Sequence, residues 1–247
     1  MPLGLEPFWR YYGGKWRAAP RYPAPAPAPL GEPFAGAAGY SLRYYDKRVI
    51  LVEKYPVVAE IWRYLIGARS EEVLSIPLVE HVDELPSRVP EGARWLVGFA
   101  MNAAVTSPRS SLSAGRKRLR EKGRNYEGWS EMQRARVARQ VDAIKHWKVF
   151  ELGYEETGSF NPRATWFVDP PYKRSGVHYV HSSKSIDYAH LADYCRSRRG
   201  QVIVLEEEGA DWLPFRAFGD IKSSGMRGKA GRGSGVSRGV VWYGGAI

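Results

Sequence analysis

A short apolar run that ends on a carboxylate and two prolines, TWFVDPPY at residues 165–172, constrains the fold of this chain more than any other feature. Every residue from Thr165 to Val168 is β-branched or aromatic, which is typical of a strand buried on both faces. Such a strand belongs in a sheet that has helices packed on both sides. The sequence therefore predicts an open α/β sheet, with ligands expected outside the carboxyl ends of its strands.

The residues that follow this run form a cluster of hydrogen-bond acceptors. Asp169 lies at the carboxyl end of the predicted strand, where ligands bind in open α/β sheets. Pro170 and Pro171 fix φ and lack an N–H, so the carbonyls of Asp169 and Pro170 are left free to accept. The ring of Tyr172 lies beside them. The alternative is a strand followed by a proline turn with an incidental aspartate.

Charge points to a polyanionic partner. Over 247 residues the formal net charge is +11 and the isoelectric point is near 9.7, while 44% hydrophobic and 26% charged residues are ordinary for a soluble globular protein. Nucleic acid is the commonest partner of such a surface, although a basic surface can also serve solubility alone. The length suits one large α/β domain or a domain with an insertion.

The single cysteine, Cys195, excludes an internal disulfide and a cysteine-rich metal site, so we expect a reducing compartment and no metal. No apolar run is long enough to cross a bilayer, and the N-terminus lacks the pattern of a signal peptide. These features predict a cytoplasmic protein that needs no membrane. We expect a monomer, with a dimer as the alternative.

Three segments of the first 67 residues have the chemistry of a nucleotide site. YYGGK at 11–15 combines paired glycines with a compact positive charge, and EPFAGAAG at 32–39 allows a tight turn into a helix whose amides can face a ligand. The apolar run Val49–Val52 predicts a strand that ends at Glu53, suitably spaced to bind ribose hydroxyls. Pro56 then begins a helix that ends near Gly67. Plain turns and a surface glutamate are the alternatives.

From about 75 to 147 the sequence predicts an inserted, mainly helical, basic subdomain. Ser130 and Gln133 form a capping-box pattern at the start of one helix. Basic side chains of this kind grip phosphates, although a run of them is usually a solvated face. The run comprises Arg116, Lys117, Arg118, Arg120, Lys122 and Arg124.

The C-terminal part predicts a helix over IDYAHLADYCRSRRG that Gly200 ends, then a buried strand over QVIVLEE. A glycine- and serine-rich loop with Lys229 and Arg232 follows, before a last strand that contains VVWY. Flexible basic loops suit a phosphate backbone. Lys173 and Arg174, directly after DPPY, are further candidates for phosphate contacts.

Taken in order, YYGGK, EPFAGAAG, the acidic strand end at Glu53, the long insert and DPPY resemble the Dam-like class of N6-adenine DNA methyltransferases. The resemblance spans about residues 9–243, but the insert matches only in placement and basic character. It implies a Rossmann-like methyltransferase sheet formed by residues 1–74 and 148–247. It also implies a target-recognition subdomain over 75–147, S-adenosylmethionine as cofactor, double-stranded DNA as partner, and a bacterial or phage-infected cell as the setting.

The resemblance implies a role for each motif residue. Asp169 and Pro170 would accept the two hydrogens of the target amine, Pro171 would fix their geometry, and Tyr172 would stack on a flipped-out adenine. The chain departs from the family's usual aspartate at Glu53 and from its frequent tryptophan at Tyr11. The residues placed at the cofactor are Tyr11, Gly14, Lys15, Phe34, Gly36, Glu53 and Asp169.

Two alternatives remain at this stage. One is a methyltransferase that acts on cytosine N4 or on RNA, because the same acceptor geometry serves any exocyclic amine. The other is a catalytically inactive DNA-binding relative in which the motifs persist only as structure.

Overall fold

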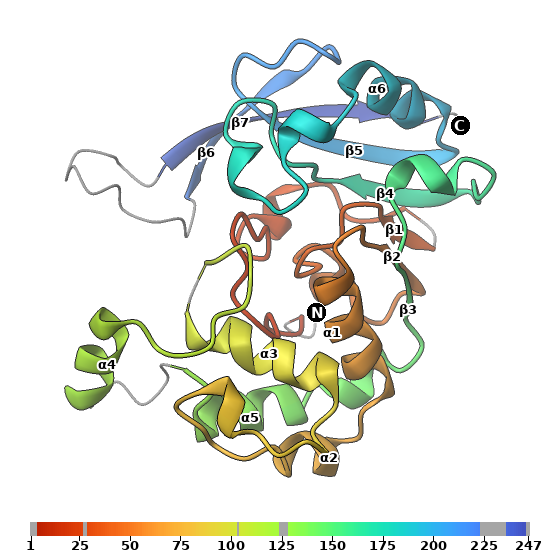
Figure 1. Cartoon of the computed structure of the whole chain (residues 1–247). Coiled ribbons are helices and arrows are strands. Elements are labelled where there is room, and N and C mark those ends of the chain that lie inside the picture. Colours follow the sequence, from red (N-terminus) through yellow and green to blue (C-terminus); the bar gives the residue numbers. More distant parts are fainter. Residues whose placement is uncertain (1–3, 27–28, 103, 124–127, 223–235, 246–247) are drawn as a thin grey trace.

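The computed structural model describes residues 4–26, 29–102, 104–123, 128–222 and 236–245 and contains a seven-stranded sheet in the order β3-β2-β1-β4-β5-β7-β6 (Figure 1). The first five strands of this order are parallel, β7 is antiparallel to β5, and β6 is antiparallel to β7. The predicted α/β fold is confirmed, and the sheet, which is mostly parallel and flanked by helices, is compatible with a Rossmann-like fold. The strands are β1 (Leu30–Glu32), β2 (Val49–Val52), β3 (Lys148–Phe150), β4 (Ala164–Val168), β5 (Gly200–Glu207), β6 (Arg216–Lys222) and β7 (Val236–Gly244).

Helices cover both faces of the sheet, as the apolar run of β4 predicts. Phe167 packs into one core together with α1 (Pro56–Gly67) and α3 (Glu91–Met101). Trp166 and Val168 point to the other face and pack with α6 (Tyr188–Ser197). Because successive side chains of a strand alternate between faces, a strand in this position is apolar at every residue.

The helical segment between β2 and β3 lies on one side of the sheet (Figure 1). It contains α2 (Ser70–Leu74), α4 (Ala114–Glu121) and α5 (Glu131–Ala138), as well as α1 and α3. Helix α3 packs on α1, and α5 packs on α2, so most of the segment shares the core of the sheet. The described part of residues 75–147, the predicted insert, contains the helices α3, α4 and α5. Its assignment as a recognition subdomain, with the boundaries 1–74, 75–147 and 148–247, stays a prediction.

Two local predictions are only partly right. Ser130 Oγ accepts from the N–H of Gln133 at 3.3 Å, but the Gln133 amide donates to the Phe8 carbonyl, so half of the capping box forms. The turn over 36–39 forms with Gly36 and Ala38 at positive φ, but a short 3-10 helix (Ser41–Tyr44) follows it in place of an α-helix.

The prediction that Gly200 ends α6 is wrong. The helix ends at Ser197, and Gly200 opens β5 with φ of +97°. A Cβ at this position would lie 2.2 Å from the Ala164 carbonyl oxygen, so close pairing with β4 accounts for the glycine. The basic loop between β6 and β7 lies outside the described residues. In the part of the chain that the structure describes, no helix is long and apolar enough to cross a membrane.

Candidate functional site

One cavity of about 240 Å³ lies at the carboxyl ends of β1, β2 and β4. Its walls include three segments that are far apart in the sequence: the N-terminal turn, the glycine-rich turn after β1 and the DPP segment after β4. Residues 53–55, 153–155, 179–181 and part of 185–190 complete the wall. The carboxyl ends of parallel strands meet at one edge, which explains why these motifs converge. The wall includes every residue that was predicted at the cofactor: Tyr11, Gly14, Lys15, Phe34, Gly36, Glu53 and Asp169.

An ion pair joins the N-terminal turn to the end of β4. Lys15 Nζ donates to Asp169 Oδ2 at 2.8 Å and to the Gly13 carbonyl at 2.8 Å. The side chains of Lys15 and Asp169 are only 9% and 18% exposed, so water screens this pair weakly. Lys15 Nζ also lies 4.9 Å from the centroid of the Tyr172 ring. The pair therefore favours the charged form of a carboxyl whose pKa is raised by burial.

The second oxygen of this carboxylate is available. Asp169 Oδ1 and the Tyr172 hydroxyl are buried and have no partner by hydrogen-bond geometry among the described atoms, although the hydroxyl is near enough to lower the pKa of the carboxyl. Burial raises the pKa of Asp169, and Lys15 opposes that rise. A buried acceptor without a partner is costly, and it suits a site that receives a donor from a ligand.

The two prolines hold the backbone beside this carboxylate. The Pro171 carbonyl accepts from the Tyr188 hydroxyl at 2.6 Å, whereas the Pro170 carbonyl accepts no hydrogen bond from the described residues. Pro171 lines the cavity, whereas Pro170 is buried, Tyr172 is half-buried, and neither belongs to the wall. Asp169 and Pro170 are consecutive residues at the end of β4, and neither Asp169 Oδ1 nor the Pro170 carbonyl has a hydrogen-bond partner among the described residues.

Glu53 holds the turn that follows β1. Its two carboxylate oxygens accept from the N–H groups of Gly36 and Tyr55, each at 2.8 Å. Burial raises the pKa of Glu53, and these backbone hydrogen bonds oppose the rise. Gly36 has φ of +45°, and a Cβ there would meet the Tyr11 ring at 3.2 Å, so a larger residue would narrow the cavity.

Residues that the sequence analysis did not single out also line the cavity. Glu32, at the end of β1, accepts from the N–H of Ser41 at 2.7 Å, and burial raises its pKa to about 8. Tyr179 donates to the Tyr12 carbonyl at 3.2 Å and lies 6.1 Å from the Tyr11 ring. Glu32 is the first residue of the EPFAGAAG motif, so the sequence could have indicated it as a residue of the site. Tyr179 lies in an irregular loop that contains no motif, so no feature of the sequence indicated it.

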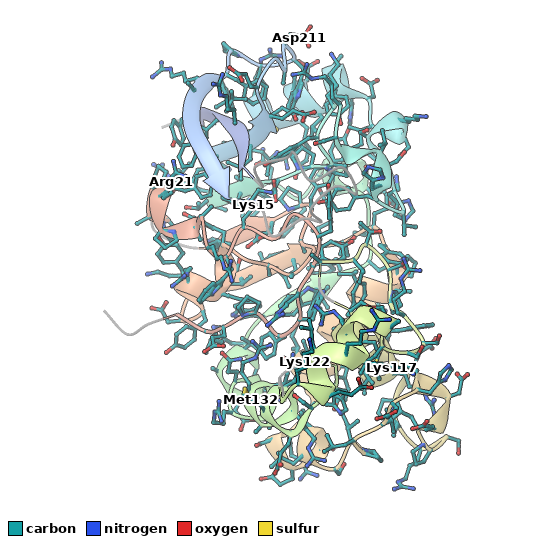
Figure 2. The ribbon with its side chains drawn as sticks, turned by 90° about the vertical axis from the view of Figure 1, so that its left-hand side faces the viewer. Lys15, Arg21, Lys117, Lys122, Met132 and Asp211 are labelled. Carbon is teal, nitrogen blue, oxygen red and sulfur yellow. The ribbon has the colours of Figure 1, made fainter. Side chains whose placement is uncertain are left out.

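The basic helix α4 lies in the half of the molecule opposite to α6 (Figure 1). In the view of Figure 2, Lys117 and Lys122 of the α4 region appear below Lys15. Lys117, Arg118 and Lys122 are exposed, and Arg116 is half-buried. The backbone of Arg120 lies in α4, while Arg124, Lys229 and Arg232 lie outside the described residues.

Intramolecular partners engage the side chains of both Lys173 and Arg174. Lys173 Nζ pairs with Asp211 at 2.7 Å. Arg174 lies 3.9 Å from the Glu207 carboxylate and donates to the Glu208 carbonyl. DNA would have to compete with these contacts, so a DNA-binding role of the two residues stays a prediction.

Comparisons with known proteins add no assignment: no protein-family model matches the chain, and no curated protein is significantly similar to it. Among the described residues, no three histidine, cysteine, aspartate or glutamate side chains gather in a way that could hold a metal ion.

Proposed function

We propose that this protein transfers a methyl group from S-adenosylmethionine to N6 of a flipped-out adenine in double-stranded DNA. The observation that carries the proposal is the arrangement at the end of β4. A largely buried carboxylate has one oxygen paired with a lysine and the other without a partner by hydrogen-bond geometry, and it is followed directly by Pro170 in the chain. The resemblance to the Dam-like class agrees with this arrangement.

The residues of the cavity fit the cofactor. Glu53 offers a carboxylate to ribose hydroxyls, and the Gly36 turn leaves space where a side chain would narrow the wall. The rings of Tyr11, Phe34 and Tyr179 supply an apolar lining. S-adenosylmethionine, when bound, supplies an electrophilic methyl group on a sulfonium.

Asp169 and Pro170 would prepare the nitrogen for attack. The exocyclic nitrogen of adenine is a poor nucleophile because its lone pair is delocalised into the ring. Acceptance of one hydrogen by Asp169 Oδ1 and of the other by the Pro170 carbonyl favours a pyramidal nitrogen with a localised lone pair. The N–C bond forms as the C–S bond breaks, and the nitrogen then loses a proton through Asp169 to solvent.

Lys15 would support this step without occupying the free oxygen. Its ammonium on Oδ2 opposes the rise of the Asp169 pKa that burial causes, so the carboxyl stays able to accept a hydrogen. The half-buried Tyr172 ring beneath the site offers a stacking surface for a base. An adenine inside a duplex cannot reach this depth, so the base must leave the helix.

The basic side of the protein supports a nucleic-acid substrate. The exposed cations of the α4 region (Figure 2) would contact phosphates that flank the target base. A duplex bound across this side would present a flipped nucleotide toward Asp169.

The decisive experiment is transfer of labelled methyl from S-adenosylmethionine to unmethylated duplex DNA, with mass spectrometry of the product nucleosides. Wild-type protein should produce N6-methyladenine, Asp169→Ala should abolish it, and Asp211→Ala, which removes an exposed carboxylate, should not. Methylated cytosine or RNA would point to the alternative substrates. Failure to bind the cofactor would refute the enzymatic proposal.

A further inference from the structure

The turn directly after the DPPY segment is held by two adjacent carboxylates of β5. The N–H of Lys173 lies 3.2 and 3.3 Å from the two oxygens of Glu206. The N–H groups of Arg174 and Ser175 donate to Glu207 Oε1 at 2.7 and 2.8 Å. Three consecutive backbone donors therefore converge on two neighbouring side chains.

Glu206 is built into this position. It is 0% exposed, and it also accepts from its neighbour's N–H at 2.9 Å and from Trp212 Nε1 at 2.9 Å. Burial raises its pKa to about 7, and the hydrogen bonds oppose that rise. A buried acidic side chain is costly unless donors surround it, and the ionised carboxylate accepts from these donors without adding an O–H that needs an acceptor of its own.

The held turn is tied to the catalytic segment itself. The N–H of Gly176 donates to the Tyr172 carbonyl at 2.7 Å. A Cβ on Gly176 would lie 2.6 Å from the carbonyl carbon of Pro171, so the turn packs closely on that proline. The pairing of Val168 with Val204 brings the end of β5 to the same edge of the sheet as Asp169.

We propose that Glu206 and Glu207 are positioning residues that hold the backbone of residues 173–175 and thereby fix Pro170 and Tyr172 beside Asp169. This inference rests on the proposed methyl transfer for its catalytic consequence. Neither carboxylate lines the cavity, so each acts through the turn and touches no reacting atom. The expected signature of their loss is slower methyl transfer with cofactor affinity retained.

Matched variants separate this role from general damage. Glu206→Gln replaces one acceptor oxygen with an N–H₂ group that opposes the surrounding donors. Glu207→Ala removes the acceptor of two amides, whereas Glu207→Gln keeps an oxygen that can accept both. Asp211→Asn weakens only the exposed contact with the Lys173 side chain and serves as the control.

Two measurements test the proposal. Amide hydrogen exchange at residues 173–175 should accelerate at least about tenfold in Glu206→Gln and Glu207→Ala, and remain near wild type in the other two variants. The single-turnover rate of methyl transfer to duplex DNA should fall at least about tenfold in the same two variants, while the Kd of S-adenosylmethionine changes less than about threefold.

Several outcomes would overturn the inference. Unchanged exchange in both damaging variants would show that the carboxylates do not hold the turn. Cofactor affinity lost in parallel with the rate, or Glu207→Gln as slow as Glu207→Ala, would indicate a general structural role. If the wild-type protein methylates no DNA, the proposed function fails, and hydrogen exchange alone then decides whether the carboxylates hold the turn.

Discussion

Replacement of Lys15 by methionine should destabilise the protein in a manner that depends on pH. The substitution keeps most of the side-chain volume but removes the cation that lies 2.8 Å from Asp169 Oδ2. Because Oδ1 already has no partner by hydrogen-bond geometry, both oxygens of a largely buried carboxylate would then lack one. The charged carboxylate must either remain unpaired or take up a proton.

The magnitude follows from the burial of the pair. Removal of one partner of a buried ion pair lowers the free energy of unfolding by about 3–5 kcal/mol. The side chains of Lys15 and Asp169 are only 9% and 18% exposed, so the pair is nearly buried and this range applies to it. For a chain of this size such a loss lowers Tm by about 6–20 °C. Lys117→Met, on the exposed face of α4, should lower Tm by no more than about 2 °C.

The pH dependence has a definite sign. Burial raises the pKa of Asp169, and loss of Lys15 raises it further because the opposing cation is gone. A carboxyl whose folded-state pKa exceeds its unfolded value contributes stability below the unfolded pKa and loses it as pH rises through the folded pKa. The destabilisation of Lys15→Met should therefore be smallest near pH 4 and largest near pH 8.

Thermal unfolding followed by circular dichroism across this pH range provides the assay. The double variant Lys15→Met/Asp169→Asn should recover most of the lost Tm, because no buried charge remains without a partner. A decrease of less than about 2 °C at pH 8, or a double variant no more stable than Lys15→Met, would refute the argument that this pair is desolvated.

Three further predictions concern two glutamates of the cavity wall and the exposed lysines of the α4 region. Burial raises the pKa of Glu32 to about 8, so its contribution to stability should be lost as pH rises through that value; the fall in Tm from pH 6 to 9 should be smaller in Glu32→Gln, and an unchanged fall would contradict the assignment. Glu53→Gln can accept from only one of two backbone donors, so the Kd of S-adenosylmethionine measured by calorimetry should increase at least about tenfold. Lys117→Glu/Lys122→Glu should weaken duplex binding and reduce the slope of log affinity against log salt by about 0.9 for each lost phosphate contact, with cofactor affinity unchanged.

Local signals in the sequence account for the elements that were predicted correctly. The apolar runs of β2 and β4 have proline or a charged residue at their ends, and Pro56 stands at the first position of α1. Each signal lies within the element that it predicts. The convergence of the motifs at one cavity was predictable through the resemblance and through the rule that strand ends share an edge.

Other features depend on partners that are distant in the sequence. Helix α3 contains two glycines, which weaken a helix by propensity. A Cβ at Gly92 would lie 2.5 Å from the Glu60 carbonyl oxygen of α1, so close helix packing explains that glycine. Strand β1 has only three residues, too few for a periodic pattern. In the sequence, Glu206 and Glu207 indicate only the end of a strand. Their role in holding a turn could not be predicted, because the N–H groups that they accept from lie more than thirty residues earlier.

The order of strands has a consequence for how the chain folds. Strand β1 is an interior strand of the sheet. It pairs on one side with β2, the next strand in the sequence, and on the other with β4, whose Thr165 pairs with Leu30. During synthesis β1 therefore emerges with one edge unpaired until more than a hundred further residues have been made. Lys15 likewise cannot form its ion pair until Asp169, 154 positions later, has been made. Closure of so large a loop is slow, so the cavity should be among the last parts of the molecule to form.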